Sequence, residues 1–209
     1  MIRVAIIDDH RMVLDGLKHI LSREPDIEVV GEAYNADEGI RCMLNKDIDI
    51  AILDISLPDK SGLDILDIVK TKKPQLRLLM LSTFPEEQYA VRALKSGASG
   101  YLTKNSAPQE LVDAIRRINS GERYITASLA KKLADILISD DKMPHERLSN
   151  REFEIMRMIA AGKTTGEIAG ILFISTSTVG TYRSRIMEKM ALKTNADLAR
   201  YVVENRLNG

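Results

Sequence analysis

The sequence predicts an α/β fold followed by a smaller, purely helical part. Over the first 120 residues, short runs rich in β-branched residues alternate with longer stretches whose apolar residues recur at helical spacing. This alternation is typical of a parallel, doubly wound sheet with helices on both faces. From Gly121 onward the spacing is helical only, and a length of 209 residues suits two domains of about 100 residues each.

Five strands are expected in the α/β part, at residues 3–8, 27–33, 48–53, 76–81 and 100–102. The stretches between them predict helices, as where Val13, Leu17 and Leu21 fall on one helical face. In parallel sheets of this kind, ligands bind beyond the carboxyl ends of the strands. A functional site is therefore expected where these strands end.

Acidic residues end two of the expected strands, because Asp8 and Asp9 close the first and Asp54 closes the third. If these strands are neighbours, the carboxylates meet at one edge of the sheet and repel one another unless a cation or a proton compensates them. Mg²⁺ is the natural compensating ion, because it takes oxygen ligands and keeps room for water and phosphate. The sequence thus predicts a magnesium site at this edge.

A hydroxyl group and an ammonium group are expected at the same edge. Ser82 ends the fourth strand and Lys104 follows the fifth. Both would bind the peripheral oxygens of a phosphoryl group carried by Asp54. The acidic residues alone could be strand-end turn formers and Lys104 a surface lysine, whereas their joint occurrence favours phosphoryl chemistry.

The full set resembles the receiver domain of two-component response regulators. The residues that carry the resemblance are Asp8, Asp9, Asp54, Ser82, Tyr101 and Lys104. The resemblance covers residues 1–121 and implies a flavodoxin-like receiver fold with a five-stranded parallel sheet. It also implies that a histidine kinase donates the phosphoryl group, and that the protein is a regulator and not a turnover enzyme, apart from removing its own phosphoryl group.

The resemblance implies a role for each residue of the site. Asp54 is the expected phosphoacceptor, and Lys104 is expected to pair with the phosphoryl group. Asp9 is expected to bind Mg²⁺ directly and Asp8 largely through water. The backbone carbonyl of Ser56 is the third expected protein ligand of the ion.

Ser82 resembles the family's switch hydroxyl. Its movement toward the phosphoryl oxygens would vacate space for the ring of Tyr101, which changes the surface of the fourth helix, fifth strand and fifth helix. Tyr101 could also be an ordinary amphipathic rim residue.

Ser56 and Phe84 lie where the family tunes hydrolysis, so they are expected to affect the lifetime of the acyl phosphate. Asn105 replaces a frequent proline, and a cis bond before it would cost about 2.5–4 kcal/mol and is not expected.

A linker is expected at residues 122–146, between a receiver domain at 1–121 and a helical domain at 147–209. Residues 127–138 predict one helix, and the polar stretch 139–145, which contains Pro144, ends it. The formal charges of the three parts are −3, −1 and +4, although the whole chain is neutral. A basic tail suits a polyanionic partner, although such an excess is also common on solvated surfaces.

The tail resembles the four-helix, LuxR-type helix-turn-helix domain of NarL/FixJ-type regulators. The resemblance rests on the runs at residues 148–152, 162–169 and 172–182. It implies that two helices pack across a short turn and that the second, residues 176–190, lies across a DNA major groove. The last helix, residues 196–203, is a candidate dimer face, although packing within the domain explains the same residues.

DNA contacts are expected at polar residues of the tail. By the resemblance, Gly180, Thr181 and Ser184 fall where base-contacting side chains occur, and Gly180 cannot supply one. The full set of expected contacts is Lys163, Thr178, Thr181, Arg183, Ser184, Arg185, Lys189 and Lys193. Ser177 and Gly166 stand where basic residues are common, so modest affinity per tail and dependence on dimerisation are expected. For any single Lys or Arg, a solvated surface is an equal explanation.

These observations predict a DNA-binding response regulator in which phosphotransfer to Asp54, with Mg²⁺, changes the receiver surface, promotes dimerisation and controls transcription. A magnesium-dependent aspartyl phosphatase is an alternative, but such enzymes usually have an acid where Ser56 stands. A small-molecule-gated regulator is disfavoured by the polar site and the lack of tryptophan. A receiver that works through protein contacts without phosphorylation is the third alternative.

Location is expected to be cytoplasmic, without a membrane partner. No apolar run approaches the roughly 18–20 residues that span a bilayer, and the first residues lack a signal-peptide layout. The single cysteine, Cys42, lies in an apolar helical pattern and is expected to be a buried structural thiol.

Overall fold

The computed structural model describes residues 1–84, 86–138, 143–205 and 207, without the side chains of residues 86–88, 132 and 135–138. The chain divides into two compact units, Met1–Lys131 and Lys132–Gly209. The division falls inside the expected linker at residues 122–146, whose limits stay a prediction. Each unit is described by itself.

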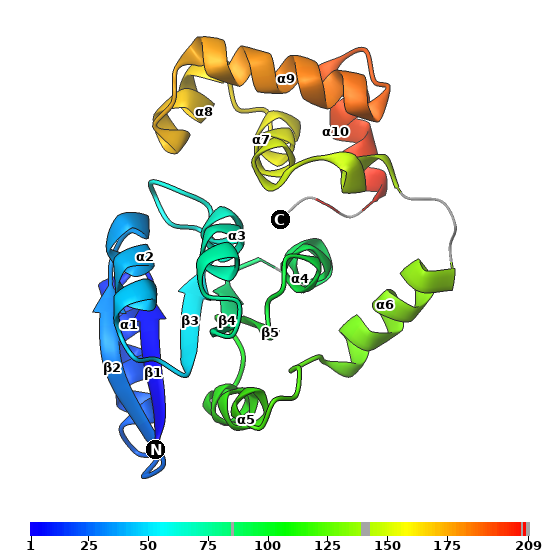
Figure 1. Cartoon of the computed structure of the whole chain (residues 1–209). Coiled ribbons are helices and arrows are strands. Elements are labelled where there is room, and N and C mark those ends of the chain that lie inside the picture. The colour runs from blue at the N-terminus through cyan, green and yellow to red at the C-terminus, as the bar shows by residue number, and fades with distance from the viewer. Residues whose placement is uncertain (85, 139–142, 206, 208–209) are drawn as a thin grey trace. The chain divides into compact units, whose positions relative to one another are not determined.

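The first unit is built on a parallel sheet of five strands in the order β2-β1-β3-β4-β5 (Figure 1). The strands are β1 (Ile2–Ile7), β2 (Ile27–Ala33), β3 (Ile50–Asp54), β4 (Arg77–Ser82) and β5 (Gly100–Thr103). The expected α/β fold with a five-stranded parallel sheet is confirmed, with strand ends that differ from the expected ones by at most two residues. Asp54 is itself the last residue of β3.

Helices connect the strands and cover both faces of the sheet. They are α1 (Arg11–Leu21), α2 (Ala36–Asn45), α3 (Gly62–Lys72), α4 (Glu86–Lys95) and α5 (Pro108–Asn119). Ile6 of β1 points into the apolar core that also contains Leu14 of α1 and Ile115 of α5. The next residue, Ile7, points the other way, because a Cβ at Gly39 of α2 would lie 2.8 Å from its side chain. This alternation is the two-residue period of a sheet buried on both faces.

The strand order places a ligand position at one end of the sheet. β1 and β3 lie side by side, and the chain leaving β1 runs to one side, to β2, whereas the chain leaving β3 runs to the other side, to β4. In doubly wound sheets the crevice at this reversal lies beyond the carboxyl ends of the strands. Asp8 and Asp54 stand at those ends of β1 and β3.

The second unit is helical. α6 (Ala127–Ile138) spans the division between the units, and the described chain continues with the short helix η1 (Pro144–Arg147), α7 (Asn150–Ala160), α8 (Thr165–Leu172), α9 (Thr176–Met190) and α10 (Asn195–Glu204). The expected helix at 127–138 and the four tail helices are present. Residues 139–142 of the expected polar stretch lie outside the described residues.

Local sequence signals explain where these helices begin and end. Ser149, Thr164 and Thr194 each accept a hydrogen bond from the third residue of the following helix, whose acidic side chain binds back to the cap. Such capping boxes satisfy amides that the helix itself leaves unpaired. Gly162 ends α7 with a φ of +81°, a conformation that glycine adopts without strain.

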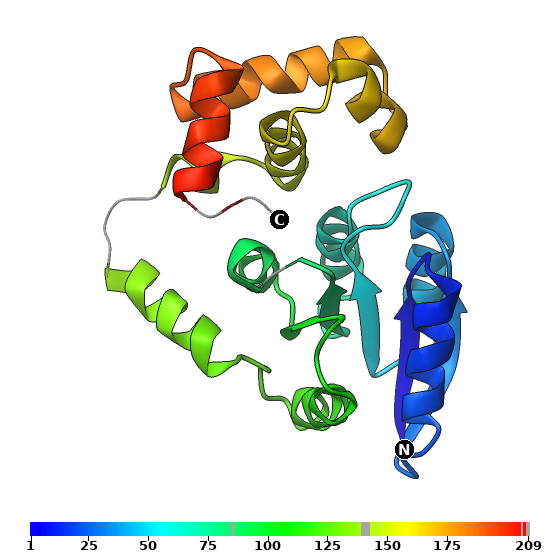
Figure 2. The ribbon, with the colours of Figure 1, turned by 180° about the vertical axis from the view of Figure 1, so that it is seen from behind.

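The beginning of the expected linker extends the edge of the sheet. Figure 2 shows the chain leaving α5 and passing into α6. The Tyr124 N–H donates to the Ser99 carbonyl at 2.9 Å, and Tyr124 pairs with Gly100 as a single bridge beside β5. The Arg117 guanidinium lies 5.6 Å from the centre of the Tyr124 ring. No helix among the described residues is both long and apolar enough to cross a membrane.

Candidate functional site

Three carboxylates meet at the carboxyl end of the sheet. Asp8 follows β1 and Asp54 ends β3, and the two strands pair directly up to Ile7 and Leu53. Both acids are only 1% exposed, whereas Asp9 is partly exposed. The structure therefore brings together the acidic residues that the sequence placed at neighbouring strand ends.

Lys104 lies between the two buried acids. Its Nζ is 2.7 Å from Asp8 Oδ2 and 2.8 Å from Asp54 Oδ2. Burial lowers the pKa of Lys104, but the hydrogen bonds to the two carboxylates outweigh this and hold the pKa above its usual range. Burial also raises the pKa of Asp54, and the ion pair with Lys104 opposes that rise only in part. One ammonium group thus faces more negative charge than it neutralises.

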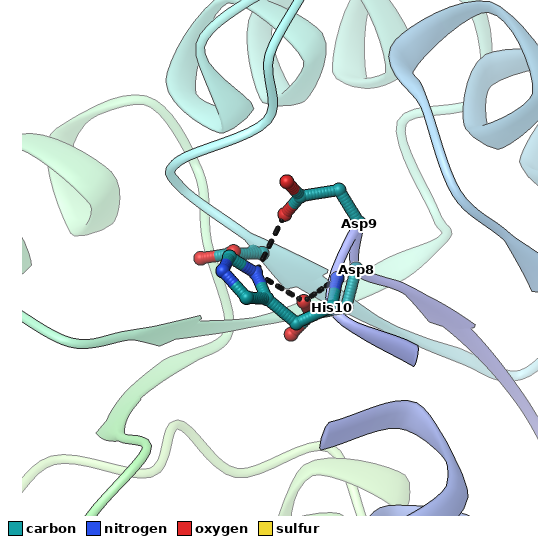
Figure 3. Close-up of side chains that lie close together, drawn as sticks. Asp8, Asp9 and His10 are labelled. Carbon is teal, nitrogen blue, oxygen red and sulfur yellow. Dashed lines mark hydrogen bonds and ion pairs between the residues drawn. The ribbon is translucent and has the colours of Figure 1, made fainter. Parts of the chain in front are cut away.

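His10 completes the acidic cluster, as Figure 3 shows. Its Nδ1 lies 2.8 Å from Asp9 Oδ1 and 3.3 Å from Asp8 Oδ1, and its backbone N–H donates to Asp8 Oδ1 at 2.9 Å. One ligand atom from each of Asp8, Asp9, His10 and Asp54 lies within 4.8 Å of all the others. The only signal for His10 in the sequence is its place directly after Asp8 and Asp9.

The donor set fits a divalent cation. Carboxylate oxygens are the ligands that Mg²⁺ prefers, and excess negative charge in a buried place favours a cation. Ser56 lies beside the cluster, because its backbone N–H donates to Asp54 Oδ1 at 3.1 Å. The expected role of the Ser56 carbonyl as a metal ligand stays a prediction.

Ser82 and Tyr101 are joined through a third residue, Phe84. The Ser82 hydroxyl oxygen accepts a hydrogen bond from the Phe84 N–H at 3.1 Å, and the Tyr101 hydroxyl donates to the Phe84 carbonyl at 2.9 Å. Ser82 and Tyr101 are both fully buried, so the Tyr101 ring is not a rim residue. The ring of Phe84 also stacks on Tyr89 of α4 with centroids 4.9 Å apart. The segment after β4 is thus tied to the end of β4 by Ser82 and to β5 by Tyr101, the two residues that the sequence named as a switch.

The backbone at Lys104 is ordinary. Its N–H donates to the Ser82 carbonyl at 2.7 Å, which continues the β4–β5 pairing by one further bond. The described backbone contains no cis peptide bond, in agreement with the trans bond expected before Asn105.

In the second unit, α9 presents a polar face and buries an apolar one. Val179, Ile186 and Met190 are buried, whereas Thr181 and Ser184 are exposed. Of the other expected DNA contacts, Lys163, Arg185 and Lys193 are exposed, and Thr178 is half-buried. The Thr178 N–H donates to the Ser175 hydroxyl, which caps α9.

Two of the expected DNA contacts bind within the protein. The Lys189 ammonium lies 2.6 Å from the carboxylate of Glu152, which is 3% exposed. The Arg183 Nε donates to Asn195 Oδ1 at 2.9 Å, which ties α9 to the start of α10. Sequence analysis did not find either pairing, because the partners lie far apart in the chain.

Both units match known protein families. Residues 4–116, more than half of the chain, match the family described as the response regulator receiver domain. The chain belongs to the response regulators. Residues 146–202 of this response regulator match the family of bacterial regulatory proteins of the luxR type, so it is a member of the NarL/FixJ subfamily.

Similar proteins match this chain over nearly their whole length. The response regulator is 34% identical to the response regulator UvrY of Escherichia coli K12, over 99% of this chain and 96% of UvrY. It is also 34% identical to the transcriptional regulatory protein LiaR of Bacillus subtilis 168, over 99% of both chains. A solved structure of RcsB from Salmonella enterica serovar Typhimurium, bound to a promoter with a phosphomimetic, is similar with a TM-score of 0.62 and 26% identity, over 96% of this chain and 97% of RcsB.

Proposed function

We propose that this response regulator accepts a phosphoryl group on Asp54 from a histidine kinase and that phosphorylation controls DNA binding by its helical unit. The single observation that carries the receiver part is the position of Lys104. Its ammonium group lies within 2.8 Å of two almost fully buried carboxylates at the end of the sheet. A buried acid beside a fixed cation suits a nucleophile whose product is a dianionic group.

Asp54 is the proposed nucleophile. One of its carboxylate oxygens forms a bond to phosphorus while the bond between phosphorus and the kinase histidine nitrogen breaks. Lys104 favours the ionised carboxylate before this step and pairs with phosphoryl oxygens after it. Mg²⁺, held by Asp8, Asp9, Asp54 and the Ser56 carbonyl, would neutralise negative charge on the phosphoryl group.

The backbone of Phe84 provides a route from the site to the surface. In our proposal the Ser82 hydroxyl turns toward the phosphoryl group and leaves the Phe84 N–H. The segment between β4 and α4 then loses its hydrogen bond to Ser82, and the Tyr101 bond to the Phe84 carbonyl rearranges with it. Such a two-state change would alter the surface formed by α4, β5 and α5.

Residues around the acceptor set the proposed lifetime of the signal. Ser56 is exposed beside Asp54, and the backbone of Phe84 binds the switch residues. Both side chains are proposed to influence the approach of water to the acyl phosphate, as expected from the sequence. The phosphoryl group is then removed by hydrolysis, so the protein is a regulator and not a turnover enzyme in this proposal.

The helical unit is the proposed DNA reader. α9 follows α8 across a short turn and has the exposed polar face that a helix in a major groove needs. Similarity to RcsB, whose solved structure contains a promoter, supports this assignment. Dimerisation through α10 would place two such helices on half-sites about 34–36 Å apart. A cytoplasmic location is part of the same proposal.

One experiment tests both phosphorylation of Asp54 and its control of DNA binding. The full chain is incubated with acetyl phosphate and Mg²⁺, and its intact mass is measured beside that of Asp54→Asn. A phosphoryl-sized gain in mass that the variant lacks supports Asp54 as the acceptor. The same samples are then compared in a DNA shift assay, and equal binding with and without modification would contradict the proposed control.

A further inference from the structure

The exposed face of α9 carries hydroxyl and carboxylate groups. Residues Ser177, Thr181, Ser184 and Glu188 follow one another at intervals of three or four, so they fall on one side of the helix. All four are exposed, and this side is opposite to the one that buries Val179, Ile186 and Met190. A helix lying in a major groove would turn this face to the base edges.

The hydroxyl protons on this face are already engaged. Thr181 Oγ1 donates to the Ser177 carbonyl at 3.1 Å, and Ser184 Oγ donates to the Gly180 carbonyl at 3.2 Å. A hydroxyl has one proton and two lone pairs, so each of these groups presents only acceptors to an outside partner. The Glu188 carboxylate, when ionised, also accepts hydrogen bonds and cannot donate them.

Two of the three basic residues of α9 lie off this face, and the third only borders it. Guanine is most often read by arginine or lysine, which donate to its O6 and N7 atoms. In α9, which the structure describes completely, the basic residues are Arg183, Arg185 and Lys189. Arg183 and Lys189 lie off the face of Thr181 and Ser184, whereas the exposed Arg185 follows Thr181 by one turn and borders that face. Arg183 and Lys189 moreover bind Asn195 and Glu152 within the unit.

We propose that Thr181 and Ser184 select bases that carry an amino group in the major groove. Their oxygens would accept hydrogen bonds from adenine N6 or cytosine N4, and would be left facing a carbonyl oxygen if guanine or thymine stood on the same strand. Glu188 is placed to extend the same preference to cytosine N4. This inference rests on the proposed DNA-binding function and names the base class that the helix reads.

The size of the effect follows from ordinary hydrogen bonds. A neutral hydrogen bond contributes roughly 0.5–1.5 kcal/mol, which corresponds to about two- to tenfold in affinity. Adenine or cytosine should therefore be enriched over guanine or thymine by about that factor at each position that faces Thr181 or Ser184. Elsewhere in the half-site no such preference is expected from these two residues.

Selection from random duplex DNA tests the proposal with the full chain, after incubation with acetyl phosphate and Mg²⁺. The variants are Thr181→Val, which keeps the shape and one methyl group but loses the acceptor, and Ser184→Ala. Thr176→Val is the matched control, because Thr176 is an exposed residue of α9 that lies away from this face. Each test variant should lose the amino-base preference at one position, and the control should keep both.

A base analogue sharpens the result. Where adenine is selected opposite Thr181, replacing it by purine, which lacks the amino group, should weaken binding of the unmodified protein by about two- to tenfold and leave Thr181→Val unaffected. Guanine or thymine at both positions, or a full preference retained by both variants, would overturn this inference while DNA binding itself stands. A protein that enriches no sequence at all would overturn the proposed DNA-binding function as well.

Discussion

The ammonium group of Lys189 contacts the carboxylate of Glu152 at 2.6 Å and so joins α9 to the first turn of α7. Glu152 also accepts a hydrogen bond from the Ser149 N–H at 2.7 Å, as part of the capping box. Lys189, which the sequence predicts to contact DNA, is therefore also a partner of a buried acid. Replacing Lys189 should therefore lower the stability of the fold, in addition to any effect on DNA binding.

Replacing Lys189 by methionine should lower the free energy of unfolding by about 1–2 kcal/mol, because the Glu152 carboxylate loses its cation partner. The loss is smaller than for a fully buried ion pair, since Lys189 is partly exposed. Chemical denaturation of the full chain, followed by circular dichroism, measures the change. Lys193→Met is the control, because Lys193 is exposed near the start of α10. An unchanged midpoint for Lys189→Met would contradict this role.

Glu152 gives the stability of the chain a defined pH dependence. Burial raises its pKa, but the bonds from Lys189 and Ser149 outweigh this and hold the pKa below the ordinary value of 4.5. A carboxyl with a lowered pKa in the folded state stabilises the fold above its unfolded pKa, and this contribution disappears as the pH falls through the folded pKa.

Glu152→Gln should therefore destabilise the chain near neutral pH, by about 1 kcal/mol, and the difference from the unmodified protein should shrink below pH 4.5. Unfolding free energies of both proteins across this range measure the effect. A difference that stays constant down to full protonation would show that the charge of Glu152 is not what matters.

Removing the charge of Lys104 should tighten Mg²⁺ binding. The ammonium group is 2.7 Å from Asp8 and 2.8 Å from Asp54, where it competes with a divalent ion for the same carboxylates. For Lys104→Met we expect affinity to rise roughly tenfold, since a unit charge this close repels the ion. Titration calorimetry with Mg²⁺ measures it directly, with Lys72→Met, an exposed residue in the last turn of α3, as control. Weaker binding by Lys104→Met alone would contradict competition.

Gly62 is required at the start of α3 because the backbone at the end of β3 passes directly against it. A Cβ there would lie 2.1 Å from the Asp54 carbonyl oxygen and 2.8 Å from the Ile55 Cα. Both are backbone atoms, which cannot move aside as the end of a flexible side chain can. Gly62→Ala should lower the free energy of unfolding by about 2–3 kcal/mol.

Gly16 offers the matched comparison. It lies within α1 with no atom within 4 Å of the position of an added Cβ. Gly16→Ala should raise the free energy of unfolding by about 0.5–1 kcal/mol, because alanine loses less backbone entropy in a helix. Thermal or chemical unfolding of both variants should give effects of opposite sign, and equal effects would contradict the crowding argument.

Sequence reasoning located the elements and the acidic edge because these depend on local signals. The apolar run that ends at Asp54 predicts a buried strand, and the spacing from Ser149 to Glu152 predicts a helix start within four residues of chain. Parallel order then brings the ends of β1 and β3 together without further information. The expected strand ends needed only small corrections.

Contacts that depend on side-chain conformation cannot be predicted from these local sequence signals. Periodicity says which face of an element is buried, but not which atom a long side chain reaches. The sequence predicts that Lys104 pairs with a phosphoryl group, whereas the structure shows that it also forms ion pairs with Asp8 and Asp54. The bonds of Ser82 and Tyr101 end on backbone atoms of Phe84, which no side-chain pattern records.

The bridge between Tyr124 and Gly100 has a consequence for the solubility of the first unit. β5 is the last strand of the sheet, and an open edge of this kind offers unpaired backbone groups to strands of other molecules. Because the Tyr124 N–H occupies the Ser99 carbonyl, the chain beyond α5 shields part of that edge. A fragment cut at residue 121 would lose this cover and expose a template for self-association, whereas one extended through Lys131 would retain it.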